Sequence, residues 1–275
     1  MKTWIKRGCI VALFLSVIPL SNAATVSEIK IPASKMKRKI SATLILPDTY
    51  KTATKKHFPV LYLLHGAGDT HVKWVQETDI AALADQYQMI VLCPNAGRTS
   101  WYFDSPISPK FQYETFVAKD CVEYLDKEYR TLADRQHRAL CGNSMGGHGA
   151  LYLGIRHLDT FSTSVSLSGG VDIRPFAGKW KIKNRLGKKK TNPERWEKHT
   201  VINLAKGLKK GQLAISMDIG TSDFFLKVNR ALDQQLTKDG IAHNYEEHPG
   251  SHGWPYWKEA IKRQMPFIKK QFDKK

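Results

Sequence analysis

Short apolar runs alternate with amphipathic segments along most of the chain. Four runs consist largely of nonpolar or small residues, as is typical of strands covered on both faces of a sheet: residues 58–64, 89–93, 138–141 and 161–168. Two later runs, 213–219 and 243–247, also predict strands. Apolar residues recur every three or four positions over 113–129, 224–236 and 254–272, which predicts helices. Strands that alternate with helices indicate an α/β fold with a mainly parallel central sheet and helices on both faces.

The two segments that precede this pattern follow a different period. Residues 25–31 and 38–46 alternate polar and apolar positions, which is typical of half-buried strands. They predict an antiparallel pair at the start of the sheet. The rest of the chain shows no internal repeat and no low-complexity segment, so residues 24–275 are expected to form one domain.

Residues 1–23 predict an export signal rather than part of the fold. Three basic residues, Lys2, Lys6 and Arg7, precede an apolar run at 9–20 that is too short to span a bilayer. Ser21-Asn22-Ala23 then fits the small-residue rule for cleavage after Ala23. We therefore expect a secreted or periplasmic protein without membrane attachment after cleavage; an uncleaved anchor is the alternative.

The remaining cysteines, Cys93, Cys121 and Cys141, fall in apolar stretches and predict buried thiols. One disulfide with one free thiol is the alternative for an exported chain. Neither these cysteines nor the ten histidines show the spacing of a metal site. No cofactor and no metal are expected.

The segment Gly142-Asn143-Ser144-Met145-Gly146 contains the candidate nucleophile, Ser144. It follows the predicted strand at 138–141 and precedes a run of small and apolar residues that predicts a helix. A serine at a sharp turn between strand and helix is exposed for attack on a carbonyl. The glycines two residues before and after it leave room for a strained backbone.

A nucleophilic serine requires a base to accept its proton and an acid to orient that base. In chain order the acid and the histidine are expected after the serine, each in a loop that follows a late strand. Asp223 and His252 occupy such loops and are assigned as the acid and the general base. Asp218 is the rival acid, but it lies within a predicted strand. His243 and His248 are the rival bases, and both lie on the next strand.

Backbone N–H groups are expected to stabilise the oxyanion that forms during attack. One donor should be the amide of Met145, directly after the nucleophile. The other should come from the loop that follows the strand at 58–64, where we assign Ala67. His65 in the same loop is assigned a structural role.

Five motifs together resemble the esterase D-like branch of α/β-hydrolases, which includes carbohydrate esterase family 1. The resemblance covers about residues 26–272 and rests on residues 63–66, 101–106, 142–147, 220–224 and 249–257. It implies an α/β-hydrolase fold with a small cap insertion, here 171–211, and serine carboxylesterase activity. Members of this group include S-formylglutathione hydrolases, small-ester carboxylesterases, feruloyl and acetyl xylan esterases, and mycolyltransferases. Asn143 departs from the Leu or His that many members carry, without removing a catalytic group.

Positive charge is concentrated in the expected cap. The chain has a formal net charge of +18, and residues 171–211 hold 13 Lys or Arg against three acidic residues, Asp172, Glu194 and Glu197. Such a surface, which includes Lys188-Lys189-Lys190, favours encounter with an anionic polysaccharide. A solvated basic face without a substrate role is the alternative. Nucleic acid is not an expected partner, because the segment matches no recognition module.

Aromatic residues provide candidate substrate contacts. We assign Trp101, Tyr102 and Trp180 to this role, because aromatic faces pack against sugar rings and feruloyl groups. Trp254 and Trp257 are expected in the core.

Export argues against a cytosolic role on formylglutathione. The expected function is hydrolysis of acetyl or feruloyl esters on plant polysaccharide or oligosaccharide, and the expected partner is that acylated substrate. The alternatives are an acyltransferase with the same three residues, a general short-chain carboxylesterase, and a noncatalytic protein that binds anionic polymers.

Overall fold

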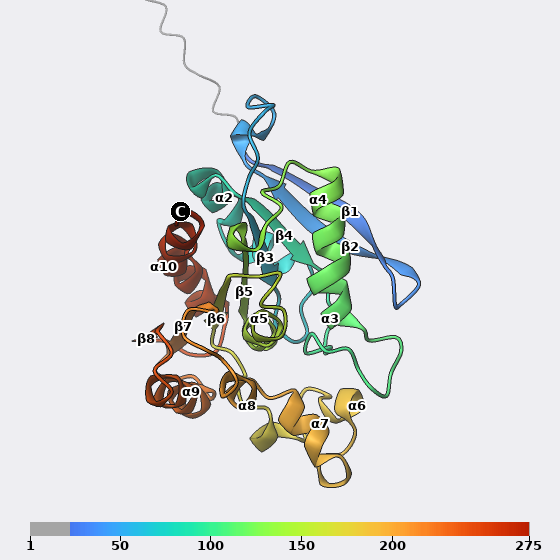
Figure 1. The fold of residues 1–275 in the computed structure, drawn as a ribbon, viewed down its shortest axis with the longest axis vertical. Coiled ribbons are helices and arrows are strands. Elements are labelled where there is room, and N and C mark those ends of the chain that lie inside the picture. Colours follow the sequence, from blue (N-terminus) through green and yellow to red (C-terminus); the bar gives the residue numbers. More distant parts are fainter. Residues whose placement is uncertain (1–22, 275) are drawn as a thin grey trace, which may run out of the picture.

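The computed structural model describes residues 23–274, so the predicted export signal lies outside the described residues except for Ala23. Eight strands of the described chain form one sheet in the order β1-β2-β4-β3-β5-β6-β7-β8 (Figure 1). Their bounds are β1 (Thr25–Ala33), β2 (Arg38–Leu46), β3 (Val60–Leu64), β4 (Ile90–Pro94), β5 (Arg138–Asn143), β6 (Thr163–Leu167), β7 (Ala214–Gly220) and β8 (His243–His248). The predicted α/β fold is confirmed.

Strand direction follows the two sequence periods. β1 pairs with β2, and β2 with β4, in the antiparallel sense, whereas every other ladder of the sheet is parallel. All residues of β3, β4, β5 and β6 are buried, including the small polar residues Thr163, Ser164 and Ser166 of β6. The polar strands β1 and β8 form the two edges of the sheet, where water solvates one side of a strand.

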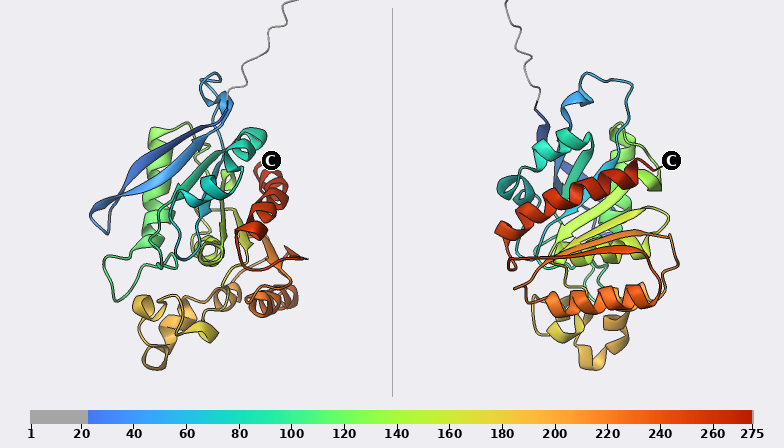
Figure 2. Two further views of the ribbon diagram at one scale, coloured as in Figure 1. Left: turned by 180° about the vertical axis from the view of Figure 1, so that it is seen from behind. Right: turned by 90° about the vertical axis from the view of Figure 1, so that its left-hand side faces the viewer.

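Helices cover both faces of the sheet (Figure 2). One face is covered by α1 (Lys73–Glu77), α2 (Ile80–Tyr87) and α10 (Trp254–Phe272), whose apolar residues share one core cluster. The second core cluster lies on the opposite face, and its helices are α3 (Tyr113–Thr115), α4 (Cys121–Glu128), α5 (Met145–Arg156) and α9 (Leu226–Lys238).

Two helices differ in detail from the sequence pattern. The helix predicted at 113–129 is interrupted by a π-helical turn, Phe116–Asp120, between α3 and α4. The helix predicted at 224–236 begins at Leu226, because Phe224 and Phe225 lie in the turn before it. Cys93, Cys121 and Cys141 are buried free thiols, and burial raises the pKa of each above its usual range.

The segment between β6 and β7 is built of short helices. It contains α6 (Lys183–Leu186), α7 (Pro193–Lys198) and α8 (Val201–Ala205), with 3₁₀ turns at Arg174–Phe176 and Lys189–Thr191. In Figure 1 it forms the yellow and orange group at the bottom of the molecule. None of the helices within residues 23–274 is long and apolar enough to cross a membrane.

Candidate active site

Ser144 occupies a sharp turn between β5 and α5. Its φ of 56° and ψ of −115° are strained for a residue with a side chain, and its N–H donates to the carbonyl of Leu167 at 2.9 Å. The flanking glycines are sterically required. A Cβ on Gly142 would lie 2.6 Å from the backbone of Gly146, and one on Gly146 would lie 2.2 Å from the carbonyl oxygen of Leu64. The turn therefore projects Ser144 from the carboxyl end of the central strands.

Three side chains form one hydrogen-bonded row. Nε2 of His252 lies 2.9 Å from Oγ of Ser144, and Nδ1 of His252 lies 2.8 Å from Oδ2 of Asp223. An ionised carboxylate only accepts hydrogen bonds, so Nδ1 carries the proton and Nε2 is free to accept one from Ser144. The side chain of Asp223 is completely buried, whereas that of His252 is 14% exposed. This arrangement can transfer the serine proton to the imidazole.

The loops that carry Asp223 and His252 are tied to each other. The N–H of Ser222 donates to the carbonyl of Gly250 at 2.9 Å, and the Asp223 N–H donates to the carbonyl of Gly220 at 3.0 Å. Oδ1 of Asp223 accepts a further bond from the Phe225 N–H at 2.8 Å. Backbone contacts thus fix the carboxylate that orients the imidazole.

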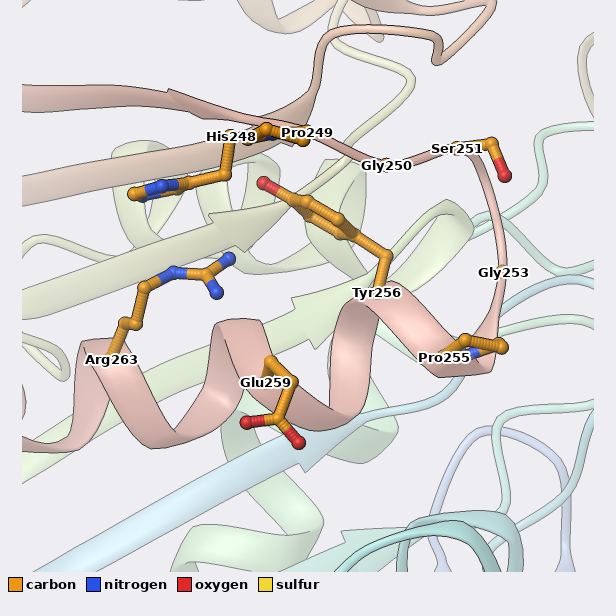
Figure 3. A pocket seen from close by; sticks show the side chains of 9 residues that line it. All are labelled: His248, Pro249, Gly250, Ser251, Gly253, Pro255, Tyr256, Glu259 and Arg263. Carbon is orange, nitrogen blue, oxygen red and sulfur yellow. The ribbon is translucent and has the colours of Figure 1, made fainter.

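The rival acid, Asp218, has other partners. Its two oxygens each accept a bond from Arg263 at 3.0 Å, and they also accept bonds from the Tyr256 hydroxyl and from Gln264. Figure 3 shows Tyr256 and Arg263 on α10 beside a pocket of about 470 Å³ under the His248–Gly253 loop. Asp218 therefore anchors α10 to β7.

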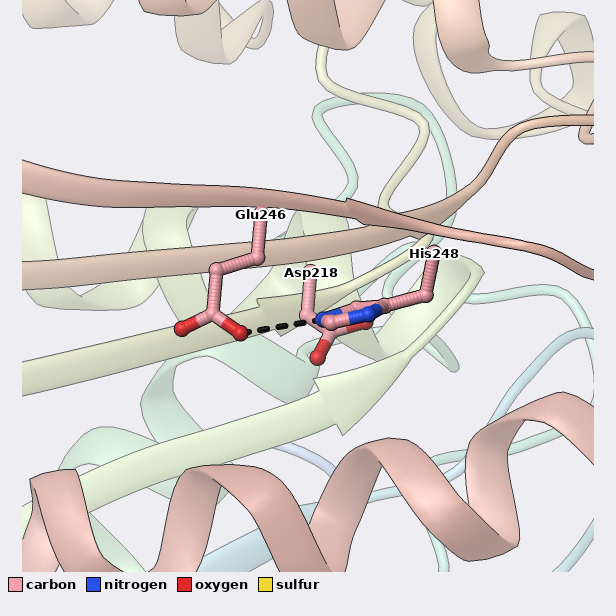
Figure 4. Close-up of side chains that lie close together, drawn as sticks. All are labelled: Asp218, Glu246 and His248. Carbon is pink, nitrogen blue, oxygen red and sulfur yellow. Dashed lines mark hydrogen bonds and ion pairs between the residues drawn. The ribbon is translucent and has the colours of Figure 1, made fainter.

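The rival histidines are also paired elsewhere. His248 lies 3.1 Å from Glu246, and His243 lies 2.9 Å from Asp233. Ligand atoms of Asp218, Glu246 and His248 lie within 4.8 Å of one another (Figure 4), which raises the question of a metal. The guanidinium on Asp218 and the bond between His248 and Glu246 fit an ion-paired network better than a cation site.

Two backbone amides near Ser144 are free to donate. Met145 is the first residue of α5, where an N–H has no acceptor within the helix. The Ala67 N–H likewise donates no backbone hydrogen bond within residues 23–274. His65 supports the Ala67 loop: its Nδ1 donates to the carbonyl of Gly66 at 2.9 Å, and its Nε2 accepts from the N–H of Ala96 at 3.0 Å. Burial lowers the pKa of His65 to about 4, which keeps the ring neutral.

A pocket of about 420 Å³ opens at Ser144 and His252. Four aromatic side chains contribute to its wall: Trp180, Phe224, Trp254 and Trp257. Asp69 also lines it, although no motif in the sequence indicated this residue. The Trp180 assignment places that residue correctly on the pocket wall.

The assignments of two other aromatic residues, Trp101 and Tyr102, require correction. Trp101 and Tyr102 are 1% and 0% exposed and lie in the core behind the site, so they do not face the pocket. Both have positive φ angles, 57° and 61°, which turn the chain inward. The expectation that Trp257 lies in the core is confirmed, and Trp254 is half-buried against the same core cluster; both also line the pocket.

Comparisons with known proteins agree with this geometry. The family model described as "Putative esterase" matches residues 33–268. An acetyl esterase from Caldicellulosiruptor saccharolyticus is 26% identical over 87% of this chain and 97% of its own length. The S-formylglutathione hydrolase of Bos taurus is 24% identical over 75% of this chain and 76% of its own.

A solved structure of a ferulic acid esterase has a TM-score of 0.80 and 27% identity. The match covers 92% of this chain and 100% of that chain. The resemblance to esterase D-like proteins and the α/β-hydrolase fold are therefore confirmed.

Proposed function

Because this chain belongs to the esterase family, we propose that it is an exported serine esterase that removes acetyl or feruloyl groups from plant polysaccharides or oligosaccharides. Hydrolysis of carboxylic esters is the activity of the family and of the related esterases. The observation that carries the proposal is the row from Ser144 through His252 to Asp223, which opens into a pocket with aromatic walls.

The proposed reaction is a two-step acyl transfer. His252 removes the Ser144 proton while Oγ attacks the ester carbonyl, and Asp223 stabilises the resulting imidazolium. The Met145 and Ala67 amides hold the oxyanion of the tetrahedral intermediate. The same imidazolium then protonates the departing alcohol. Water, activated by His252, finally releases the acid and restores the serine.

The amide donors account for a large part of the expected rate. Loss of one such donor costs about 2.7–4 kcal/mol of transition-state stabilisation in comparable sites. Both amides belong to backbone that is fixed on either side, Met145 by α5 and Ala67 by the His65 hydrogen bonds. These contacts support the proposal that both amides are held rigid before the substrate binds.

The substrate class is supported by two features. The relatives include an acetyl esterase and a ferulic acid esterase, and the pocket walls can pack against a sugar or a feruloyl ring. Exposed lysines of the segment 171–211 add positive charge: Lys179, Lys181, Lys183, Lys188, Lys189 and Lys190. Arg185 does not contribute to this surface, since it is buried against Phe111.

The test compares hydrolysis of p-nitrophenyl acetate, p-nitrophenyl butyrate, methyl ferulate and acetylated glucuronoxylan by the purified protein and its Ser144→Ala variant. Release of acetate from the xylan or of ferulate, lost in the variant, supports the proposal. Turnover of the p-nitrophenyl esters alone would contradict the polysaccharide assignment. Formation of new esters with added alcohols in place of hydrolysis would favour an acyltransferase.

Export is tested separately. The protein recovered from the periplasm or medium of its host should begin at Ala24, as determined by N-terminal sequencing. Recovery from the cytoplasm with Met1 still present would contradict the proposed export.

A further inference from the structure

The pocket at Ser144 contains one carboxylate that the proposed mechanism does not use. Asp69 follows Ala67 by two residues in the loop after β3, and its side chain lines the pocket. It forms no ion pair within residues 23–274; Lys73, four residues further on, pairs instead with Glu77 at 2.6 Å. The carboxylate is half-buried, and Lys73 and Arg98 act on it through their charge without direct contact. Such a group favours a ligand that donates a hydrogen bond.

Neighbouring side chains partly offset the burial of this carboxylate. Burial raises the pKa of the Asp69 carboxyl, and the positive charge of Lys73 and the nearby indole of Trp254 lower it in part. A carboxylate has about four acceptor positions. Acceptor capacity therefore remains on the pocket side, next to an aromatic wall.

Asp69 lies close to the reacting serine. A Cβ placed on Gly66 would be 3.5 Å from Oδ2 of Asp69 and 3.5 Å from Cβ of Ser144. The two side chains thus flank the same small space, and Gly66 leaves it open. Any hydroxyl that reaches Asp69 from an ester bound at Ser144 must lie near the ester group itself.

The short distance between Asp69 and Ser144 decides whether the hydroxyl that reaches Asp69 belongs to the acyl group or to the alcohol part of the ester. The phenolic hydroxyl of a feruloyl group is separated from the carbonyl by a vinyl link and an aromatic ring, and it points away from the ester. The hydroxyl on a sugar carbon next to the esterified carbon is only a few bonds from the ester oxygen. The distance between Asp69 and Ser144 fits the sugar hydroxyl.

We propose that Asp69 determines specificity for the alcohol part of the substrate, by accepting a hydrogen bond from a free hydroxyl vicinal to the ester. This inference rests on the proposed esterase function of the same site. The substrate is then a partly acylated polyol or sugar, in which the carbon next to the cleaved ester carries a free hydroxyl. An alcohol part with a carboxylate at that place is disfavoured by charge repulsion.

The test uses two esters of equal size, 2-hydroxyethyl acetate and propyl acetate, which differ in a hydroxyl against a methyl group. The full-length protein should cleave the hydroxyl ester with a kcat/KM higher on the order of tenfold, as expected for a hydrogen bond to a charged group. Asp69→Ala should bring the kcat/KM values of the two esters within about twofold of each other, with the larger fall for 2-hydroxyethyl acetate. Asp69→Asn, which keeps the shape and one acceptor, should retain part of the preference.

Asp159→Ala is the matched control, because it removes an exposed carboxylate far along the chain and should preserve the preference. Equal rates for both esters in the unmodified protein would overturn the proposal. An equal fall in both rates in Asp69→Ala would also overturn it, since Asp69 would then support the site as a whole.

Acetylcholine serves as a third ester. Acetylcholine could be cleaved faster than both other esters, with this preference lost in Asp69→Ala and kept in Asp159→Ala. The carboxylate and the aromatic wall would then bind a cation, and the hydroxyl proposal would be wrong. A failure of the esterase function itself is distinguishable: p-nitrophenyl acetate would then be cleaved equally by the unmodified protein and by Ser144→Ala.

Discussion

Asp218 and Asp223 are both buried carboxylates at the carboxyl end of β7, yet their partners differ in kind. Asp223 contacts an imidazole, His252, that can gain and lose a proton. Asp218 contacts the guanidinium of Arg263, which is permanently charged, through two bonds of 3.0 Å. The first pair can therefore support proton transfer, and the second can only support the fold.

The end of β7 therefore carries one aspartate proposed to act in catalysis, Asp223, and one that holds α10 to the sheet, Asp218. Asp218 joins β7 to α10 through Arg263 and Tyr256, and α10 begins directly after the loop of His252. The ion pair thus stabilises the loop from which His252 reaches Ser144. Substitutions at the two aspartates should separate activity from stability.

Asp223→Asn should produce the largest effect. An amide at this position no longer holds the imidazole in the required tautomer, and kcat for p-nitrophenyl acetate should fall about 10⁴-fold. The free energy of unfolding should change little in comparison. A variant that retains more than a tenth of the activity would show that Asp223 is not the orienting acid.

Asp218→Asn should mainly change stability. It leaves Arg263 without its counter-charge, and breaking a buried pair costs about 3–5 kcal/mol, with the lower value expected because Arg263 is partly exposed. Urea denaturation measures the loss. The rate per folded molecule should remain within a fewfold of normal. A 10⁴-fold loss in kcat with unchanged stability would reverse the roles assigned to the two aspartates.

Two buried histidines, His65 and His148, differ from His252 because burial keeps their rings neutral. Burial lowers the pKa of His148 to about 3 and that of His65 to about 4, from an ordinary value near 6.5. Below pH 6.5 the unfolded chain binds protons at these rings that the folded chain does not, so stability falls with pH until the folded values are reached. Between pH 7 and pH 5 the loss should be about 2 kcal/mol for each ring.

His148→Phe tests this pH dependence. Phe keeps the ring that stacks on Tyr152 but removes the titrating group, so the fall in unfolding free energy between pH 7 and pH 5 should shrink by about 2 kcal/mol. A variant with the same pH dependence as the unmodified protein would contradict the buried neutral state of His148.

Asn143 represents a third kind of buried polar group, one without a partner. It is 0% exposed, and neither atom of its amide has a hydrogen bond within the described chain. Asn143→Leu should raise the free energy of unfolding by about 1 kcal/mol, because it removes an unsatisfied amide at similar volume. A loss of stability would contradict the unsatisfied state of the amide.

Sequence periodicity predicted the strands, because strands buried on both faces contain few charged residues and half-buried strands alternate. The glycine-flanked serine and the chain order of the loops selected Ser144, Asp223 and His252 as the residues that the fold brings together, since each lies in a loop at the same edge of a parallel sheet. Their catalytic roles remain predictions until they are measured.

The pocket wall was less predictable. Trp101 turns inward because two consecutive residues adopt positive φ, which no pattern in the sequence indicated. Asp69 gave no signal because a single acidic residue in a polar loop is typical of a solvated surface. Its position beside Ser144 depends on the path of the loop after β3 and on the absence of a side chain at Gly66. Side-chain direction in loops is set by tertiary contacts rather than by local composition.

In the proposed mechanism Ser144 carries the acyl group during turnover. Reaction with p-nitrophenyl diethyl phosphate tests this directly, because an activated serine is phosphorylated and releases one p-nitrophenol per chain. We predict a single diethylphosphoryl adduct on the peptide that contains Ser144, complete loss of esterase activity, and no adduct in Ser144→Ala. An adduct on another residue, with activity lost to the same extent, would contradict the assignment of Ser144 as the nucleophile.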